Sequence, residues 1–186
     1  MLWERGRRDP SDRRPYGDEV ELRGEVVVLR PATMDDLDAV TWVFEGEGNE
    51  GWWPGPDRRA VARDFLGDDD VVPYVVLVDD RVVGVIQSYE EDDPDYRHGG
   101  IDITLHPDAH GRGVGTDAVR TLARHLIEHD GHHRLIIDPA AHNARAIRAY
   151  EKVGFKPVGI MRRYERGADG TFHDGLLMDL LADELT

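Results

Sequence analysis

The clearest helical pattern of the chain lies at 114–129. Apolar residues recur there in two adjacent stripes, one of which consists of Ala118, Leu122 and Leu126. Residues four apart lie on the same face of a helix, so this stretch predicts an amphipathic helix whose apolar side packs on a core.

Three other stretches predict helices. Thr33, a residue type that caps helices, precedes two acidic residues and an apolar rhythm that continues to Phe44. The segment 58–66 predicts a short helix. The segment 143–153 predicts the last helix, and Gly154 stands where a glycine commonly ends one.

Short β-branched or alternating apolar runs, bounded by Gly, Pro or Asp, predict the strands. Two of these runs are separated only by Asp79-Asp80-Arg81 and predict an antiparallel hairpin. The predicted strands are 22–31, 72–78, 82–89, 100–106, 132–138, 157–163 and 176–181. Strands and helices are mixed without a repeat or an internal linker. We therefore expect one α/β domain over 19–186, preceded at 1–18 by a flexible arm rich in Arg, Asp and Pro.

Composition narrows the function classes. The chain of 186 residues has no cysteine, which excludes a disulfide framework, a thiolate metal site and a thiol nucleophile. Its formal net charge of −15 disfavours binding to nucleic acid or an anionic membrane and favours a cationic partner, although adaptation to high salt would give the same charge. Because no signal peptide or membrane-spanning run is found, we expect a cytoplasmic protein. A homodimer is expected only because it is the commonest oligomer.

The main candidate binding motif is the glycine-rich segment before the 114–129 helix. Glycines at alternate positions allow a tight turn, and the N–H groups at the start of a helix attract an anion, so the segment predicts a phosphate-binding loop. A Walker loop would need Gly-Lys-Ser/Thr, and a dinucleotide-binding fold would need a different glycine spacing after a parallel strand. The pyrophosphate loop of an acyl-coenzyme A transferase is the third interpretation. The residues of this segment are His110, Gly111, Arg112, Gly113, Val114, Gly115 and Thr116.

A second candidate group shares one face of the 143–153 helix. Asn143, Ala146 and Tyr150 have the required spacing. Asn143 can hydrogen-bond an amide-rich ligand, and the phenol of Tyr150 can protonate a thiolate leaving group. Tyr150 can equally be a core residue with its hydroxyl at the rim.

The combination of HGRGVGT and NARAIRAYEKVGF resembles the GNAT acyltransferase superfamily. The resemblance implies a central mixed, mostly antiparallel sheet of about six to seven strands flanked by about four helices. It also implies acetyl-CoA as co-substrate and no metal. The pantetheine arm would lie along the backbone of Ile103, Thr104 and Leu105, and the glycine-rich segment would bind the pyrophosphate.

Within the superfamily, the chain looks most like the aminoglycoside 6′-N-acetyltransferases, which implies antibiotic resistance as its role. The segments that carry this likeness are Trp52-Trp53, Pro73-Tyr74-Val75, Ile86-Gln87-Ser88-Tyr89, Gly100-Ile101-Asp102 and Asp138-Pro139. Three features depart from the pattern. His110 stands where Gln or Arg is usual, the acidic loop after Tyr89 is short, and the segment 166–175 resembles the hairpin of ribosomal-protein and polyamine acetyltransferases.

The resemblance assigns an Asp base to the position of Asp102. A carboxylate can take the proton of an ammonium group, which must be lost before the amine attacks a thioester. The alternative is that Asp102 is an outward residue of an alternating strand. Asp138 would hold a second amine or simply cap a turn. The remaining residues assigned to the acceptor pocket are Trp52, Trp53, Tyr89, Glu91 and Asp92, with the Trp pair as a wall or as core anchors.

Four histidines lie in the last turns of the predicted 114–129 helix and just after it. We interpret them as a solvated helix end rather than a metal site. They are His125, His129, His132 and His133. The sequence thus predicts an acetyl-CoA-dependent N-acetyltransferase that acts by direct attack on a cationic small-molecule amine. The alternatives are a peptide, ribosomal-protein or polyamine acetyltransferase, a siderophore acyltransferase, and a non-catalytic acetyl-CoA sensor.

Overall fold

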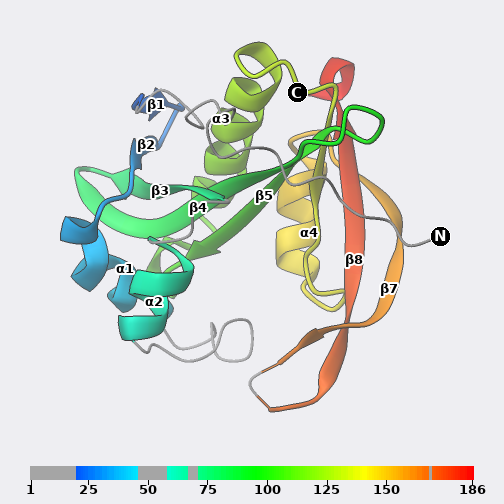
Figure 1. The fold of residues 1–186 in the computed structure, drawn as a ribbon. Coiled ribbons are helices and arrows are strands. Elements are labelled where there is room, and N and C mark those ends of the chain that lie inside the picture. Colours follow the sequence, from blue (N-terminus) through cyan, green and yellow to red (C-terminus); the bar gives the residue numbers. More distant parts are fainter. Residues whose placement is uncertain (1–19, 46–57, 67–70, 168) are drawn as a thin grey trace.

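The computed structural model describes residues 20–45, 58–66, 71–167 and 169–186. Within these residues, eight strands form one sheet in the order β1-β2-β3-β4-β5-β6-β8-β7 (Figure 1). Neighbouring strands are antiparallel except β5 and β6, which are parallel. The strands are β1 (Leu22–Arg23), β2 (Val28–Pro31), β3 (Val71–Val78), β4 (Arg81–Glu91), β5 (His98–Leu105), β6 (Arg134–Ile137), β7 (Lys156–Arg166) and β8 (Phe172–Leu181).

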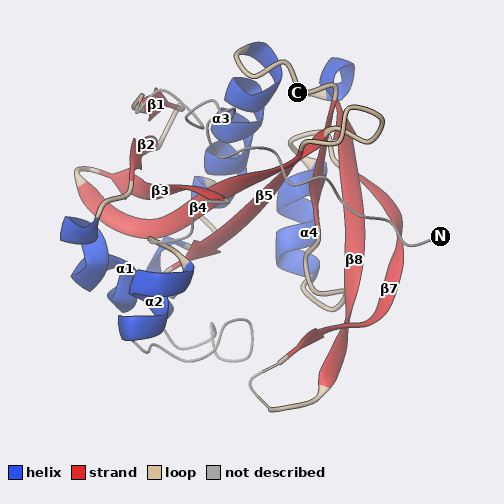
Figure 2. Ribbon diagram, in the orientation of Figure 1, coloured by secondary structure: helices blue, strands red, loops and turns tan. Residues whose placement is uncertain are grey.

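Helices lie on both faces of the sheet (Figure 2). In the described part of the chain they are α1 (Leu37–Phe44), α2 (Arg58–Asp64), α3 (Val114–Glu128) and α4 (Ala144–Glu151), with 3₁₀ turns at Met34–Asp36, Pro107–Ala109 and Ala182–Glu184. None of the described helices is both long and apolar enough to cross a membrane.

Alternation along β3 and β4 divides the core into two clusters. Tyr74 of β3 and Ile86 of β4 are paired, and their side chains join the cluster under α3 and α4. Val75 and Val85 are the next pair, and their side chains join the cluster under α1 and α2. Because successive side chains of a strand point to opposite faces, these two strands contribute to both clusters. The fold is therefore the predicted GNAT arrangement of one mostly antiparallel sheet between helices.

The sheet has one strand more than the upper predicted number, because the stretch expected as a single strand at 22–31 is split. The N–H of Gly24 donates to the carbonyl of Val27, at an N···O distance of 2.9 Å, and closes a turn. The carboxylate of Asp117 on α3 accepts the N–H groups of Glu25, Val26 and Val27 at 3.2, 2.7 and 3.0 Å. These donors are therefore directed to a side chain on α3 instead of to a strand. An apolar alternation pattern cannot reveal such a distant acceptor.

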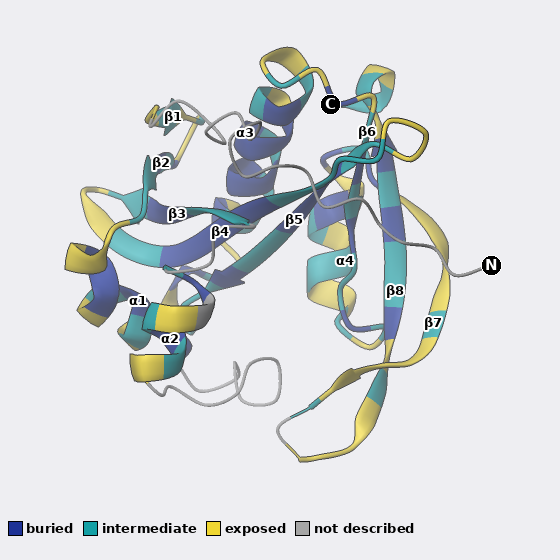
Figure 3. Cartoon of the chain, in the orientation of Figure 1, coloured by how far each residue is buried: buried dark blue, intermediate teal, exposed yellow. Residues whose placement is uncertain are grey.

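The last two strands are longer than predicted. β7 continues to Arg166 and β8 begins at Phe172, so the two form a long hairpin at the end of the sheet (Figure 1). Almost every residue of β7 is exposed (Figure 3). A strand exposed on both faces need not alternate between apolar and polar residues, and for this reason the pattern ended too early at 163.

Candidate active site

The candidate site is built around a separation between the parallel strands β5 and β6. In the described sheet they pair only at Gly99–Leu135 and Gly100–Ile136. Beyond Gly100, the stretch 101–105 of β5 stays paired with β4 on one side, while a cavity of about 940 Å³ opens between it and the stretch 137–140. A strand edge that a neighbouring strand does not occupy can hydrogen-bond an extended ligand that carries amides. The site therefore has a slot of the kind that a pantetheine arm requires.

The glycine-rich segment 110–116 forms one end of this cavity. Gly111 and Gly113 have φ angles of +73° and +82°, a region that side chains disfavour. A Cβ atom on either glycine would meet no heavy atom within 4 Å, so backbone conformation and not crowding requires glycine there. Gly113 is the N-cap of α3, and the first residues of the helix line the cavity. Their N–H groups have no partner inside a helix and suit an anionic ligand.

His110 ties this segment to β5. Its Nε2 lies 3.2 Å from the carbonyl oxygen of Leu105, which can only accept, so His110 donates. Burial and the charge of Arg145 lower the pKa of His110 and favour the neutral ring. The imidazole thus connects the loop to the slot, a role that sequence reasoning did not assign to it.

Most of the predicted coenzyme-binding residues line one cavity. They are Ile103, Thr104, Leu105, His110, Gly111, Gly113, Val114, Gly115, Thr116, Asn143, Ala146 and Tyr150. Arg112 is absent from this lining, whereas Arg145 and Arg148 of α4 belong to it.

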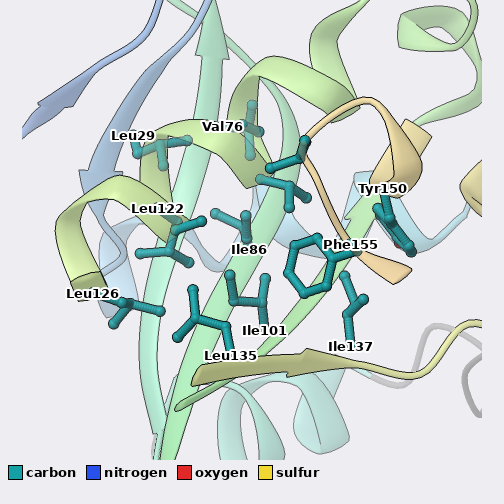
Figure 4. Packing of buried hydrophobic residues seen from close by; sticks show 14 of the residues in the cluster. Leu29, Val76, Ile86, Ile101, Leu122, Leu126, Leu135, Ile137, Tyr150 and Phe155 are labelled. Carbon is teal, nitrogen blue, oxygen red and sulfur yellow. The ribbon is translucent and has the colours of Figure 1, made fainter. Parts of the chain in front are cut away.

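Asn143 and Tyr150 lie at opposite ends of α4 and have different surroundings. Asn143 is the N-cap of the helix, and its Oδ1 accepts the N–H of Ala146 at 3.1 Å. Its Nδ2 is thus the group suited to a ligand carbonyl. Tyr150 is 7% exposed and lies beside Phe155, with ring centroids 6.3 Å apart (Figure 4). Tyr150 belongs both to the core cluster and to the cavity lining.

The phenol of Tyr150 is protonated at neutral pH. Burial, with the charges of Asp102 and Asp138 as smaller causes, raises its pKa above the ordinary value. A protonated phenol carries a proton that can pass to a leaving thiolate.

Asp102 lies on β5, in the cavity lining and opposite Gln87 of β4. Gln87 Nε2 donates to Asp102 Oδ2 at 3.1 Å. Burial, followed by the charge of Asp138, raises the pKa of Asp102, and the hydrogen bond from Gln87 lowers it. Asp102 is half-buried and lines the cavity, where the charge of Asp138 acts on it.

Two more carboxylates share this part of the cavity. Asp138 follows β6 and accepts a hydrogen bond from the hydroxyl of Tyr164, and burial raises its pKa. Glu165 of β7 also lines the cavity, and partial burial together with the charges of Asp138 and Asp102 raises its pKa. The hydrogen bond to Asp138, with burial and the nearby acidic charges, raises the pKa of Tyr164 to about 12. The charge of Asp138 thus raises the pKa of Asp102, and the charges of both raise that of Glu165, a grouping of acids that suits a positively charged ligand.

Tyr164 and Glu165 were missed because the predicted strand ended at 163. A longer strand would have placed both residues beside the acidic end of the cavity, but no apolar alternation marked its continuation. The signal in the sequence was the resemblance of the neighbouring segment 166–175 to the hairpin of ribosomal-protein and polyamine acetyltransferases.

Three of the other predicted acceptor residues, Tyr89, Glu91 and Asp92, do not line the cavity. The ring of Tyr89 covers Gly100, where a Cβ atom would come within 2.0 Å of it. Burial and the charges of Asp102 and Asp138 raise the pKa of Tyr89, which places it near the acids. Glu91 ends β4 and Asp92 follows it, and neither lines the cavity. Trp52 and Trp53 lie outside the described residues.

The histidines at the end of α3 lie away from this cavity. Within the described residues, His125, His129 and Asp130 bring possible ligand atoms within 4.8 Å of one another. The two imidazole rings are stacked, with centroids 4.8 Å apart. None of these residues contributes to the cavity lining.

The chain was compared with known proteins. The acetyltransferase (GNAT) family matches residues 37–155. An aminoglycoside N(6′)-acetyltransferase type 1 from Klebsiella pneumoniae is 33% identical over 154 residues, which cover 72% of this chain and 75% of that protein. A kanamycin resistance protein from Rhizobium radiobacter is 42% identical over 71 residues, covering 38% of this chain and 64% of that protein.

Solved structures give the same family. Aminoglycoside acetyltransferase AAC(6′)-Ib in complex with coenzyme A matches with a TM-score of 0.71 and 28% identity, covering 85% of this chain and 96% of that chain. Another structure of AAC(6′)-Ib contains ribostamycin and coenzyme A.

Proposed function

The chain belongs to the acetyltransferase (GNAT) family, whose members use acetyl-CoA, and we propose that it acetylates a primary amine of an aminoglycoside. The observation that carries the choice of acceptor is the group of three acids, Asp102, Asp138 and Glu165, that lines the cavity beside the coenzyme-binding segments. An aminoglycoside carries several ammonium groups, so more than one acid can hold it while one amine reacts. The likeness to aminoglycoside N(6′)-acetyltransferase type 1 supports the same choice and favours the 6′-amine.

The coenzyme would occupy the separation between β5 and β6. The backbone of 103–105 would bind the pantetheine arm, and the N–H groups of 111–116 would bind the pyrophosphate. Asn143 would donate from Nδ2 to an amide carbonyl, and Arg145 and Arg148, which line the cavity, would bind the 3′-phosphate. When bound, the coenzyme supplies the thioester.

The proposed reaction is direct attack in a complex of both substrates. Asp102 takes a proton from the acceptor ammonium, and the nitrogen lone pair then attacks the thioester carbonyl. The carbon–nitrogen bond forms and the carbon–sulfur bond breaks. Tyr150 donates its phenolic proton to the leaving thiolate. The attacking nitrogen loses its second proton, which passes through water to the Tyr150 phenolate, and Asp102 releases its proton to solvent before the next turnover.

A linear polyamine is the second candidate, because the same three acids would also hold it. An assay of thiol release with acetyl-CoA and separate acceptors distinguishes these functions. We expect kanamycin to give the highest kcat/KM, with spermidine lower and a peptide with a free N-terminus lower still. Preference for spermidine would select the polyamine function. Activity on the peptide alone would contradict both candidates.

A further inference from the structure

We propose that Gln87 is a positioning residue that holds Asp102 ionised and correctly oriented to act as the base. This inference rests on the proposed function, because it takes Asp102 as the proton acceptor. The register of β4 and β5 pairs Gln87 with Asp102, so their side chains share one face of the sheet. Gln87 is 7% exposed, and its Nε2 donates to Asp102 Oδ2 at 3.1 Å.

Packing alone does not account for a glutamine at this position. Among the described residues, the Oε1 atom of Gln87 is buried and has no hydrogen-bond partner. A buried carbonyl oxygen without a partner destabilises a fold, so an apolar side chain of the same length would pack better. The bond to Asp102 is the contact that uses the amide, and it sets the orientation of the side chain.

The charged group that acts on Asp102 from another element, Asp138, disfavours its ionised form. Asp138 after β6 and Glu165 of β7 are acidic, and three hydroxyls are contributed by Tyr89 of β4, Tyr150 of α4 and Tyr164 of β7. Burial and the charge of Asp138 raise the pKa of Asp102, whereas the Gln87 amide lowers it. Gln87 is thus the neighbour whose hydrogen bond favours the ionised form of Asp102.

The hydrogen bond from Gln87 also gives the two carboxylate oxygens of Asp102 different roles. Oδ2 is occupied by the Gln87 amide. Oδ1 then remains as the atom that takes the proton from the acceptor ammonium. A side chain without the amide would leave the carboxylate able to rotate, and the proton-accepting oxygen would lose its fixed direction.

The test compares Gln87→Met, which keeps the length without the donor, with Gln87→Asn, which keeps the amide but shortens its reach. The acid limb of kcat/KM against pH for kanamycin is measured for each. We expect it to move upward by about one to two pH units in both variants, since a hydrogen bond to a charged group is worth about that much. At pH values below this limb, kcat/KM of each variant is roughly 10- to 100-fold lower than that of the unmodified protein. The KM for acetyl-CoA stays unchanged.

A direct readout does not depend on the acceptor. The carboxyl carbon of Asp102 is titrated by ¹³C NMR in the coenzyme A complex and assigned by its loss in Asp102→Asn. The titration midpoint rises in the Gln87 variants. Thr121→Val is the matched control, because Thr121 is 5% exposed and bonds within α3 to the carbonyl of Asp117. Its pH profile and its Asp102 titration coincide with those of the unmodified protein.

Two negative results are distinguishable. If Asp102→Asn retains full activity, the proposed function of Asp102 fails. If Asp102→Asn is inactive while the Gln87 variants keep the wild-type pH profile and titration midpoint, the positioning role of Gln87 is overturned and the base assignment stands.

Discussion

Two interior carboxylates of this protein, Asp117 on α3 and Asp102 on β5, differ in the number of donors that surround them. Asp117 is 5% exposed and accepts three backbone N–H groups from the turn between β1 and β2. Asp102 accepts one side-chain amide and faces Asp138 across the cavity. The fold thus supplies three hydrogen-bond donors to the carboxylate of Asp117 and one to that of Asp102.

The difference separates a structural acid from a chemical one. The three donors that Asp117 accepts connect α3 to the start of the sheet. Asp102 has fewer donors and a neighbouring negative charge, so an ammonium group would supply what the fold does not. Asp102→Asn should therefore lose activity and keep its stability, whereas Asp117→Asn should lose stability and keep its activity.

The largest expected effect is the loss of turnover in Asp102→Asn. An amide cannot accept the ammonium proton, so kcat should fall by roughly 10²- to 10⁴-fold, the range typical of a general base. The affinity for acetyl-CoA should change little, because the coenzyme segments are separate from this side chain. Steady-state kinetics with kanamycin and calorimetry with coenzyme A measure the two quantities.

The matching result is that Asp102→Asn unfolds no more easily than the unmodified protein. A variant that is both inactive and strongly destabilised would mean that Asp102 serves the fold, as Asp117 does. Normal turnover would remove Asp102 from the mechanism.

Asp117→Asn should instead lose stability and keep its chemistry. The amide retains one acceptor oxygen, but its NH₂ group faces backbone donors that are buried with it. We expect the free energy of unfolding to fall by roughly 2–4 kcal/mol, as for lost hydrogen bonds to a charged group. Urea denaturation measures this, with Asp108→Asn as the control because the side chain of Asp108 is 85% exposed. If Asp117→Asn were as stable as the control, the connection between α3 and the turn would contribute nothing.

Tyr150→Phe should reduce kcat by roughly 10- to 100-fold, less than the change at Asp102, because water can partly replace a general acid. The ring still packs beside Phe155, so the free energy of unfolding should change little. Stopped-flow measurement of thiol release isolates the acetyl-transfer step. An unchanged rate across the pH range would leave Tyr150 with packing alone.

The contrast between Asp117 and Asp102 also explains what the sequence could predict. The 114–129 helix, the hairpin at 72–89 and the phosphate-binding loop were predictable, because each depends on local periodicity or on glycines at fixed spacing. The burial of Asp117 was not, since its three donors lie about 90 residues away in the chain. The same distant contact caused one predicted strand to be counted where the structure has two.

The candidate site divides in the same way. The predicted coenzyme-binding residues fall in three stretches, 103–105, 110–116 and 143–150, and all of them except Arg112 line the cavity. The acceptor half brings together β5, the end of β6 and β7, so Tyr164 and Glu165 could not be found from spacing. Glu91 and Asp92 were chosen for their charge, but they lie outside the cavity lining. The amino-acid composition shows that the protein is acidic, but only the fold shows which of its acidic side chains line the cavity.

The smallest expected effect concerns how the free energy of unfolding depends on pH. The pKa of Asp102 is raised in the folded protein, so ionising it costs more in the folded than in the unfolded state. This destabilisation is present above the folded pKa and disappears as the pH falls below the unfolded value near 4. Asp102→Asn lacks it, and should therefore be more stable than the unmodified protein at pH 7, by about 1 kcal/mol for each unit by which the pKa is raised. Urea denaturation of both proteins between pH 4 and pH 8 should show their stabilities converging towards acid pH, whereas a constant difference would indicate that the amide changes packing rather than the ionisation of Asp102.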